Sequence, residues 1–299
     1  MEGSFSHFAE KGSMIKTFSF NSAAEFLAHA QAALEADEAA HSLILGVCLR
    51  LRDQPAQATS QVCLKTIEDE GGLALAAMLT PPHNLSISGR PADLDFSLGL
   101  LVSELAGEGW PIPGVLAPAP IARLFAEKLA KKSQGGFQLT RQLNLLDLRQ
   151  APPRPPGGQA RLRPASQQDL ALIARWFYGF TLEIFKSADE TEARQMAEQR
   201  LRDKDVFVWE DGGRVVSMAM KNRPTRRSIC VSHVYTPPEL RGKGYATACV
   251  AELSHQLLQS GWEFCTLFVD VANLPACRAY QKIGYSLVSE YEEYRFPPL

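Results

Sequence analysis

The chain has 299 residues, enough for two domains of ordinary size. Hydrophobic residues make up 45% and charged residues 21%, as in folded globular proteins, and the net charge of −2 gives no general attraction to nucleic acid or to an anionic membrane. No apolar run approaches the roughly 18 residues of a transmembrane helix, and residues 1–30 show no signal peptide, so we expect a cytoplasmic protein without a membrane partner.

The cysteine pattern predicts thiols rather than disulfides. None of the cysteines forms a C-x-x-C pair, and most lie inside apolar runs, which favours buried thiols in a reducing compartment and argues against a metal site. The positions are Cys48, Cys63, Cys230, Cys249, Cys265 and Cys277.

In chain order, residues 1–13 end in Gly12-Ser13, are treated as a leader or an upstream start, and receive no predicted element. Residues 150–160 read QAPPRPPGGQA, with four prolines and two glycines in eleven residues, which excludes a regular helix or strand. A complete pattern of strands and helices restarts at Arg161, so we interpret this segment as a linker rather than a long surface loop. We expect an N-terminal domain over 14–150, a linker over 151–160 and a C-terminal domain over 161–299.

Three short segments of the N-terminal half recur in the C-terminal half, in the same order and with a longer second copy. The first pair reads as a strand end, an acidic Gly-Gly turn and a second strand. The pairs are EDEGGLALAAM (68–78) with EDGGRVVSMAM (210–220), Gly109-Trp110 with Gly261-Trp262, and PIARLF (120–125) with PACRAY (275–280). The recurrence predicts two tandem copies of one fold.

The C-terminal half alternates strand and helix signals. The expected elements are a strand at 161–165, helices over 168–185 and 189–202, a hairpin of 206–210 and 214–221, a strand over 229–235, a helix over 245–260, a strand over 264–269, a helix over 275–283 and a strand near 290–296. The order strand, loop, helix, strand over 229–269 implies a parallel crossover.

The loop that precedes the helix at Tyr245 reads PPELRGKGYATACV over 237–250. At a helix N-terminus the first N–H groups have no partner within the helix, and the helix dipole is positive. Gly242 and Gly244 would let an anion approach without a Cβ in the way, and Arg241 and Lys243 add positive charge. The pattern predicts a diphosphate site, with a ligand-free glycine turn as the alternative. The spacing fits neither a Walker loop nor a dinucleotide fingerprint.

Residues 241–246, RGKGYA, resemble the R/Q-x-x-G-x-G/A signature of the GCN5-related N-acetyltransferases (GNAT), which binds the diphosphate of acetyl-coenzyme A. Residues 273–285, NLPACRAYQKIGY, are similar to a second motif of that family, N-x-x-A-x-x-x-Y-x-x-x-G-[FY]. The resemblance covers about residues 161–299. Together with the internal repeat it implies an α/β protein of two tandem GNAT-like domains, each a mixed, mostly antiparallel twisted sheet flanked by helices.

The resemblance also implies roles for matched residues. A primary amine would attack the thioester of acetyl-CoA, the co-substrate, and Tyr280 would donate a proton to the departing sulfur. The pantetheine arm would be held by backbone groups of Val234, Tyr235 and Thr236 and by Asn273. The diphosphate would be bound by Arg241, Gly242, Lys243, Gly244, Tyr245, Ala246 and Thr247.

The general base is left open between two residues. His233 has a suitable pKa range, and Asp270 ends the following strand. Each also has a structural reading, as a satisfied strand histidine and as a loop cap. The carboxylate that some relatives carry on the fifth strand is replaced here by Phe268, so none carries over.

The acceptor pocket in this fold would be shaped by the first two helices. Residues 176–185, WFYGFTLEIF, supply five aromatic side chains, some for the core, with Trp176 and Tyr178 as pocket candidates. We interpret the basic residues Arg223, Arg226 and Arg227 as an exposed hairpin turn.

The N-terminal copy has no R-x-x-G-x-G segment, and Phe125 and Pro118 stand where the other copy has Tyr280 and Asn273. We expect a degenerate partner domain. The favoured function is an acetyl-CoA-dependent N-acetyltransferase for a small amine or amino-acid derivative. The alternatives are a non-catalytic acyl-CoA-binding or regulatory module and a protein N-terminal or lysine acetyltransferase. The acceptor and the oligomeric state, a homodimer included, are left open.

Overall fold

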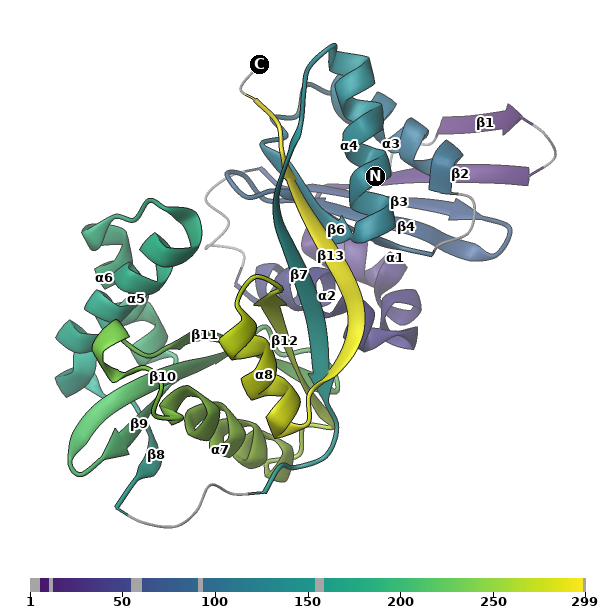
Figure 1. Cartoon of the computed structure of the whole chain (residues 1–299). Coiled ribbons are helices and arrows are strands. Elements are labelled where there is room, and N and C mark those ends of the chain that lie inside the picture. Colours follow the sequence, from purple (N-terminus) through teal and green to yellow (C-terminus); the bar gives the residue numbers. More distant parts are fainter. Residues whose placement is uncertain (1–5, 11–12, 55–60, 91–93, 154–158, 298–299) are drawn as a thin grey trace.

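The computed structural model describes residues 6–10, 13–54, 61–90, 94–153 and 159–297. The middle of the predicted linker, 154–158, lies outside the described residues. Within them a 13-stranded twisted sheet runs through both halves of the chain, with helices on its faces (Figure 1), which confirms the α/β class. No helix of the described chain combines the length and the apolar character needed to cross a bilayer.

The two halves share one order of main elements, starting from β2 and from β8. The N-terminal half contains β1 (Ser6–Glu10), β2 (Ser13–Phe20), α1 (Ala23–Ala36), α2 (Glu38–Asp53), β3 (Cys63–Asp69), β4 (Gly72–Leu79), β5 (Leu85–Gly89), α3 (Leu94–Gly107), β6 (Gly114–Pro118), α4 (Ala119–Ser133) and β7 (Gln138–Leu148). The C-terminal half contains β8 (Arg161–Pro164), η2 (Gln167–Asp169), α5 (Leu170–Phe185), α6 (Glu190–Arg202), β9 (Val206–Asp211), β10 (Arg214–Asn222), β11 (Ser228–Tyr235), η3 (Pro238–Leu240), α7 (Tyr245–Gln259), β12 (Phe264–Asp270), α8 (Leu274–Ile283) and β13 (Ser286–Arg295).

The last strand of each half lies in the sheet of the other half. The strand order is β1-β2-β3-β4-β5-β6-β13-β7-β12-β11-β10-β9-β8. Strand β7 pairs antiparallel with β12, β13 pairs antiparallel with β6, and the two exchanged strands pair with each other at the centre of the molecule (Figure 1). The predicted domain boundaries therefore match the two copies of the sequence repeat. The sheet, however, is continuous across these boundaries, because it contains strands of both halves.

The repeated segments fall on equivalent elements of the two halves. The first pair forms the β3–β4 and β9–β10 hairpins. Gly109-Trp110 follows α3 as Gly261-Trp262 follows α7, and the third pair lies in α4 and α8. In each half the first two helices cover one face of the sheet and the next two cover the other, so each sheet face has its own core.

Most element boundaries of the C-terminal half lie within two residues of the prediction. The parallel pairing of β11 with β12 confirms the predicted crossover. The last strand begins earlier than expected, at Ser286, because β7 offers it a partner along most of its length. Residues 1–13 received no predicted element, whereas Ser6–Glu10 forms β1, which pairs antiparallel with β2 at the edge of the sheet. Five of the six cysteines are buried and all six are free thiols, as expected.

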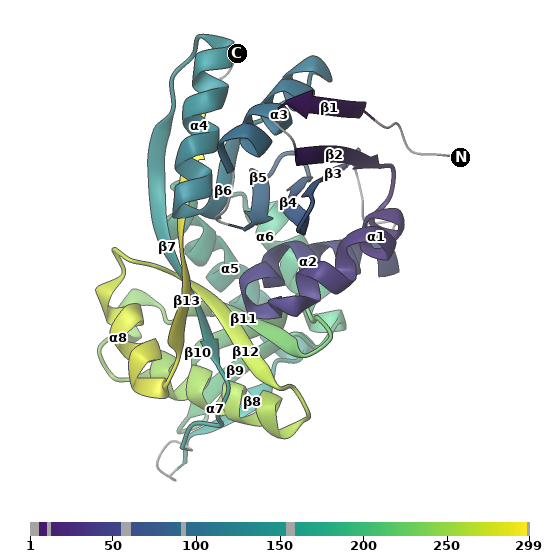
Figure 2. The same ribbon diagram turned by 90° about the vertical axis from the view of Figure 1, so that its right-hand side faces the viewer.

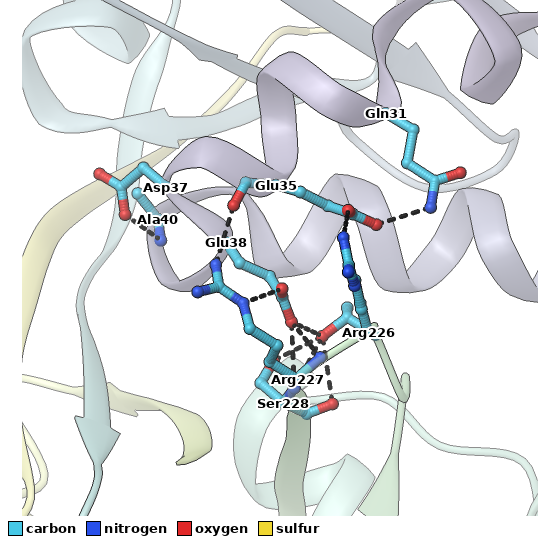
Figure 3. A network of polar contacts seen from close by, with 9 residues as sticks. Gln31, Glu35, Asp37, Glu38, Ala40, Arg226, Arg227 and Ser228 are labelled. Atoms are coloured by element: carbon cyan, nitrogen blue, oxygen red, sulfur yellow. Dashed lines mark hydrogen bonds and ion pairs between the residues drawn. The ribbon is translucent and has the colours of Figure 1, made fainter. Parts of the chain in front are cut away.

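The turn between β10 and β11 docks on the N-terminal half (Figure 3), so its interpretation as an exposed turn was wrong for Arg223 and Arg227, which are partly buried, whereas Arg226 is exposed. Glu38, whose side chain has no exposed surface, lies at the start of α2 and accepts hydrogen bonds from this turn. Its donors are Thr225 Oγ1 at 2.5 Å, Arg227 N at 2.8 Å, Arg227 Nε at 2.9 Å and Ser228 N at 3.0 Å. Burial opposes ionisation, but the hydrogen bonds from Thr225 and Arg227 outweigh it and lower the pKa of Glu38.

Candidate active site

The parallel strands β11 and β12 pair along only part of their length. The pairs are Ser228 with Phe264, Ile229 with Cys265 and Cys230 with Thr266. Beyond Cys230 no pairing joins the described parts of these two strands, so the edge of β11 that faces β12 keeps free backbone groups. An extended ligand can bind to such an edge through main-chain hydrogen bonds.

A bulge in β11 lies in this unpaired stretch. Met218 of β10 pairs with Tyr235 and Met220 pairs with Ser232, so β11 carries one extra residue. Within the bulge His233 has a φ of 47°, a rare value for a residue with a side chain. Bulges of this kind redirect the strand and its side chains, and they are frequent beside functional sites. The predicted pantetheine-binding residues Val234 and Tyr235 follow directly.

The glycine loop joins β11 to α7 and leaves the helix N-terminus uncapped by any side chain. Gly242 and Gly244 have φ values of 79° and 80°, and a Cβ on either residue would have no neighbour within 4 Å. The first turn of α7 contains no acidic residue. The loop and the exposed Lys243 therefore present unpaired N–H groups and positive charge to an open space, which is the chemistry of an anion site.

The side chain of Arg241 is used within the protein. Its Nη2 donates to both carboxylate oxygens of Glu183 in α5, at 2.6 and 2.9 Å, and its Nε donates to the carbonyl of Thr236 at 2.8 Å. Arg241 thus ties the loop to α5, so the N–H groups of the loop are better placed than this guanidinium to contact a diphosphate. Tyr245 makes a similar tie, because its hydroxyl donates to Asp211 Oδ2 at 3.0 Å.

Tyr280 lies in α8 on the face of the sheet that α7 also covers. The residue is 8% exposed, and burial, together with the nearby Cys249 of α7, raises the pKa of its hydroxyl. Its hydroxyl has no hydrogen-bond partner among the described residues. The neighbouring Tyr285, whose ring centroid lies 5.9 Å away, is satisfied by Ser254 Oγ at 2.8 Å. The hydroxyl of Tyr280 is therefore available to donate a hydrogen bond to a ligand.

Asn273 and Asp270 lie where β12 ends and α8 begins. Asn273 is the N-cap of α8, and its Oδ1 accepts from Ala276 N at 3.2 Å. Asp270 Oδ1 accepts from Ala272 N at 2.8 Å. The amide nitrogen of Asn273 remains available to a ligand, whereas Asp270 has the geometry of a loop cap. The parallel ends of β11 and β12 bring both residues to the same edge of the sheet as the glycine loop.

His233 lies on the opposite face of the sheet from Tyr280, against α5. Its ring stacks on Phe180 at 4.8 Å and meets Phe177 edge-on at 5.4 Å. Burial, assisted by the charges of Arg200 and Arg223, lowers its pKa to about 4. His233 is therefore neutral at pH 7 and a weak base.

The aromatic residues of α5 divide as expected between core and surface. Trp176 and Tyr178 line a cavity of about 670 Å³ between α5, the β9–β10 turn and the segment that leads to the glycine loop. Tyr235 also borders this cavity, and its hydroxyl lies so close to Gly179 that a Cβ there would be 2.6 Å away. Thr236 is buried and exchanges a hydrogen bond with Ser217 Oγ at 2.9 Å, so its side chain is structural.

Strand β7 of the N-terminal half also borders this site, which was not predicted from the sequence. Strand β7 pairs with β12 up to Asp270, where it places Leu143 opposite, and Val271 N donates to Gln142 O at 3.0 Å. The N-terminal half therefore forms the wall on the far side of β12. The repeat alone carries no signal of the exchange, because each copy is complete in sequence.

Comparisons with known proteins identify the C-terminal half. The sequence model of the acetyltransferase (GNAT) family matches residues 170–285. No curated protein matches the chain. The matched region contains β11, the glycine loop, α7, β12 and α8.

Solved structures share the fold over most of the chain. A GCN5-related N-acetyltransferase from Sphaerobacter thermophilus superposes with a TM-score of 0.57 at 20% identity, covering 83% of this chain and 85% of that one. A Drosophila protein superposes with a TM-score of 0.64 at 12% identity, covering 92% and 96%. A GCN5-related glucosamine N-acetyltransferase region of a fungal multi-domain beta-N-acetylglucosaminidase gives a TM-score of 0.55 at 14% identity, covering 96% of this chain and 38% of that one. The family match and the site geometry agree: residues 170–285 form an acyltransferase domain of the GNAT family, whose members use acetyl-CoA as co-substrate.

Proposed function

We propose that this chain transfers the acetyl group of acetyl-CoA to a primary amine, in a single site at the opening between β11 and β12. The observation that carries the proposal is that this opening adjoins an uncapped, glycine-lined helix N-terminus and the helix of Tyr280, a buried residue whose hydroxyl has no hydrogen-bond partner among the described residues. The helix N-terminus binds a diphosphate, and the tyrosine hydroxyl is suited to stabilise a departing sulfur. A binding module without chemistry would not need the free hydroxyl of Tyr280.

The binding roles follow from the free groups. The N–H groups of residues 242–247, with Lys243, bind the diphosphate. The unpaired backbone of Val234 and Tyr235 holds the pantetheine arm along β11, and the side-chain amide of Asn273 donates to the arm near the thioester.

The chemistry needs a neutral amine and a stabilised thiolate. An alkyl ammonium with a pKa near 10.4 is deprotonated in about 1 part in 2500 at pH 7, which costs roughly 4.6 kcal/mol. The amine nitrogen attacks the carbonyl carbon, the C–S bond breaks, and the amine proton leaves to solvent. Because the pKa of Tyr280 is raised, its hydroxyl stabilises the departing sulfur by donating a hydrogen bond. His233 accepts a hydrogen bond from the amine and orients it.

A screen of amines tests the proposal. Purified full-length protein is mixed with acetyl-CoA and with amines, amino acids, amino sugars and peptides, and thiol release is followed. Amino sugars belong in the screen because the fungal region of similar fold is a glucosamine N-acetyltransferase. We expect release above the hydrolysis rate with at least one small amine. Binding of CoA without release by any amine, in a protein that is folded, would support a regulatory acyl-CoA-binding module instead.

A further inference from the structure

Three arginine side chains gather where α2 of the N-terminal half meets the C-terminal half. Arg50 belongs to α2, Arg200 to α6, and Arg223 follows the end of β10. Figure 2 shows α2 alongside β11, with α5 and α6 beyond. The backbones are in close contact here, because a Cβ on Gly46, one turn before Arg50, would lie 2.6 Å from the Cβ of Arg223.

The positive charge of this cluster is poorly balanced. Arg200 Nη1 lies 3.3 Å from Asp205 Oδ2, the one carboxylate paired with the cluster among the described residues. Arg50 makes no ion pair in the described part of the chain. Burial and the charges of Arg200 and Arg223 lower the pKa of Arg50. A partly buried guanidinium without a counter-ion, as at Arg50 and Arg223, is costly, and a bound anion would offset this cost.

Two buried polar atoms at the cluster also lack partners within the described chain. They are Arg223 Nε and Asn222 Oδ1. Arg223 uses its Nη2 to donate to Cys230 Sγ at 2.9 Å, which leaves its Nε free. Its φ of 45° is rare for a residue with a side chain. Backbone strain and an unsatisfied buried donor both destabilise a protein core. Such features are more often found where a residue holds a ligand.

The cluster lies beside the proposed acceptor side of the opening. Arg223 Nη2 donates to Cys230 Sγ of β11 at 2.9 Å, three residues before His233, which lies in the bulge of β11 that borders the opening. In agreement with this contact, the charges of Arg200 and Arg223 lower the pKa of His233. An anionic group held by the arginines would therefore position a nearby amine on the face opposite Tyr280.

We propose that the acceptor amine carries an anionic group, a carboxylate or a phosphate, which is bound by Arg50, Arg200 and Arg223. This rests on the proposed acetyl transfer. The N-terminal half then supplies Arg50 as a specificity residue, which gives that half a function without a catalytic centre of its own.

Matched substrates and matched variants test the proposal. Glucosamine 6-phosphate is compared with glucosamine, and an amino acid with its amide, so that both sources of negative charge are sampled. We expect the anionic member of at least one pair to have a kcat/KM at least about tenfold higher, the effect of one or more charge-assisted hydrogen bonds. Arg50→Gln should lower that ratio at least about tenfold, and Arg50→Lys should restore part of it. Arg52→Gln, on the same helix with its side chain paired to Asp53, should leave the ratio unchanged.

Stability and binding measurements separate this inference from the proposed activity. Removing an unpaired charge should not destabilise the free protein, so Arg50→Gln should match or exceed the unfolding midpoint of Arg52→Gln. If no amine releases thiol, the acetyl-transfer proposal fails, and inorganic phosphate is then titrated calorimetrically into full-length protein saturated with CoA. Phosphate binding that is lost in Arg50→Gln and kept in Arg52→Gln would still support the anion site. Equal binding in both variants, no binding at all, or a raised KM for acetyl-CoA in Arg50→Gln would overturn it.

Discussion

Pro118 and Asn273 occupy the same position in two equivalent helices, the N-caps of α4 and α8. Two turns further along, Phe125 of α4 and Tyr280 of α8 are both buried. A buried aromatic ring is therefore kept at the second position in both halves. The amide and the hydroxyl, which the proposed chemistry uses, are present only in the C-terminal half.

The loops that precede α3 and α7 differ in the same way. Strand β5 ends at Gly89 and α3 begins at Leu94, with Asp95 in its first turn, so the positive helix end already faces a carboxylate of its own chain. The longer connection before α7 contains the two glycines at positive φ and leaves the helix end free of acid. The N-terminal half therefore shares the packing residues of these helices with the other half but does not contain the glycine loop that we propose binds a diphosphate.

The N-terminal half contributes instead to the other half. It provides β7 beside β12 and Glu38 beneath the β10–β11 turn. The reverse contribution is strand β13, which completes the N-terminal sheet. The following predictions test this division of roles, from the largest expected effect to the smallest.

Replacing Glu38 with alanine should be the most damaging change. It leaves the backbone N–H groups of Arg227 and Ser228 without their acceptor, which costs about 1–3 kcal/mol each in the free energy of unfolding, and it removes the partner of the partly exposed Arg227 guanidinium. Chemical denaturation measures the loss. Glu35→Ala is the control, because Glu35 pairs with the exposed Arg226 at 3.4 Å, and it should cost less than about 1 kcal/mol. Equal costs for the two variants would show that the halves do not depend on this contact.

Tyr280→Phe recreates the residue of the N-terminal copy. It removes the hydroxyl that we propose stabilises the departing sulfur, so kcat should fall about 10²-fold while the Kd of acetyl-CoA changes only a few fold. Steady-state kinetics and calorimetry measure the two quantities. Tyr285→Phe is the control, since that hydroxyl bonds Ser254: it should cost about 1–3 kcal/mol of stability and spare kcat. Full activity in Tyr280→Phe would remove the main chemical difference between the halves.

Gly244→Ala and Gly72→Ala form a matched pair from the two halves. Both glycines have positive φ, 80° and 94°, and both face open space, so alanine adds similar strain of about 1–2 kcal/mol at each. Only Gly244 lies in the proposed diphosphate loop, so only Gly244→Ala should raise the Kd of CoA, by about tenfold or more. Calorimetry should also give one CoA per chain. A stoichiometry of two would show that the N-terminal half still binds the co-substrate.

The local elements and the diphosphate loop were predictable because they depend on short-range signals. The apolar residues of α7 repeat with a helical period, and glycines mark the Asp211–Gly213 turn. Each of these signals lies within the element that it predicts. The motifs around Gly244 and Tyr280 together indicate a family. Their spacing in sequence depends only on the lengths of α7 and β12, which connect them.

The long-range arrangement was not predictable in this way. Exchanging β7 and β13 changes which half each strand pairs with, but not its apolar pattern or length. Arg227 appeared exposed because its partner, Glu38, is distant in sequence. The cluster of Arg50, Arg200 and Arg223 is assembled only when α2 packs on the C-terminal half, so no local pattern announces it.

The smallest expected effect concerns His233. Its replacement tests whether this residue is a general base or only orients the amine. Its pKa of about 4 lies well below that of an alkyl ammonium, near 10.4, so it cannot retain the amine proton at pH 7. We expect His233→Gln to lower kcat/KM less than about tenfold, since glutamine still offers a hydrogen-bond acceptor.

Because the folded pKa of His233 is depressed below its unfolded value, near 6.5, the stabilising effect of a neutral His233 is present above pH 6.5 and is lost as the pH falls through about 4. The pH profile of kcat/KM between 5.5 and 8 should therefore have the same shape in both proteins, while the acid unfolding limb should be shallower in His233→Gln. An acid limb in kcat/KM near pH 6.5 that disappears in the variant would show that His233 titrates in the working range and acts as the general base after all.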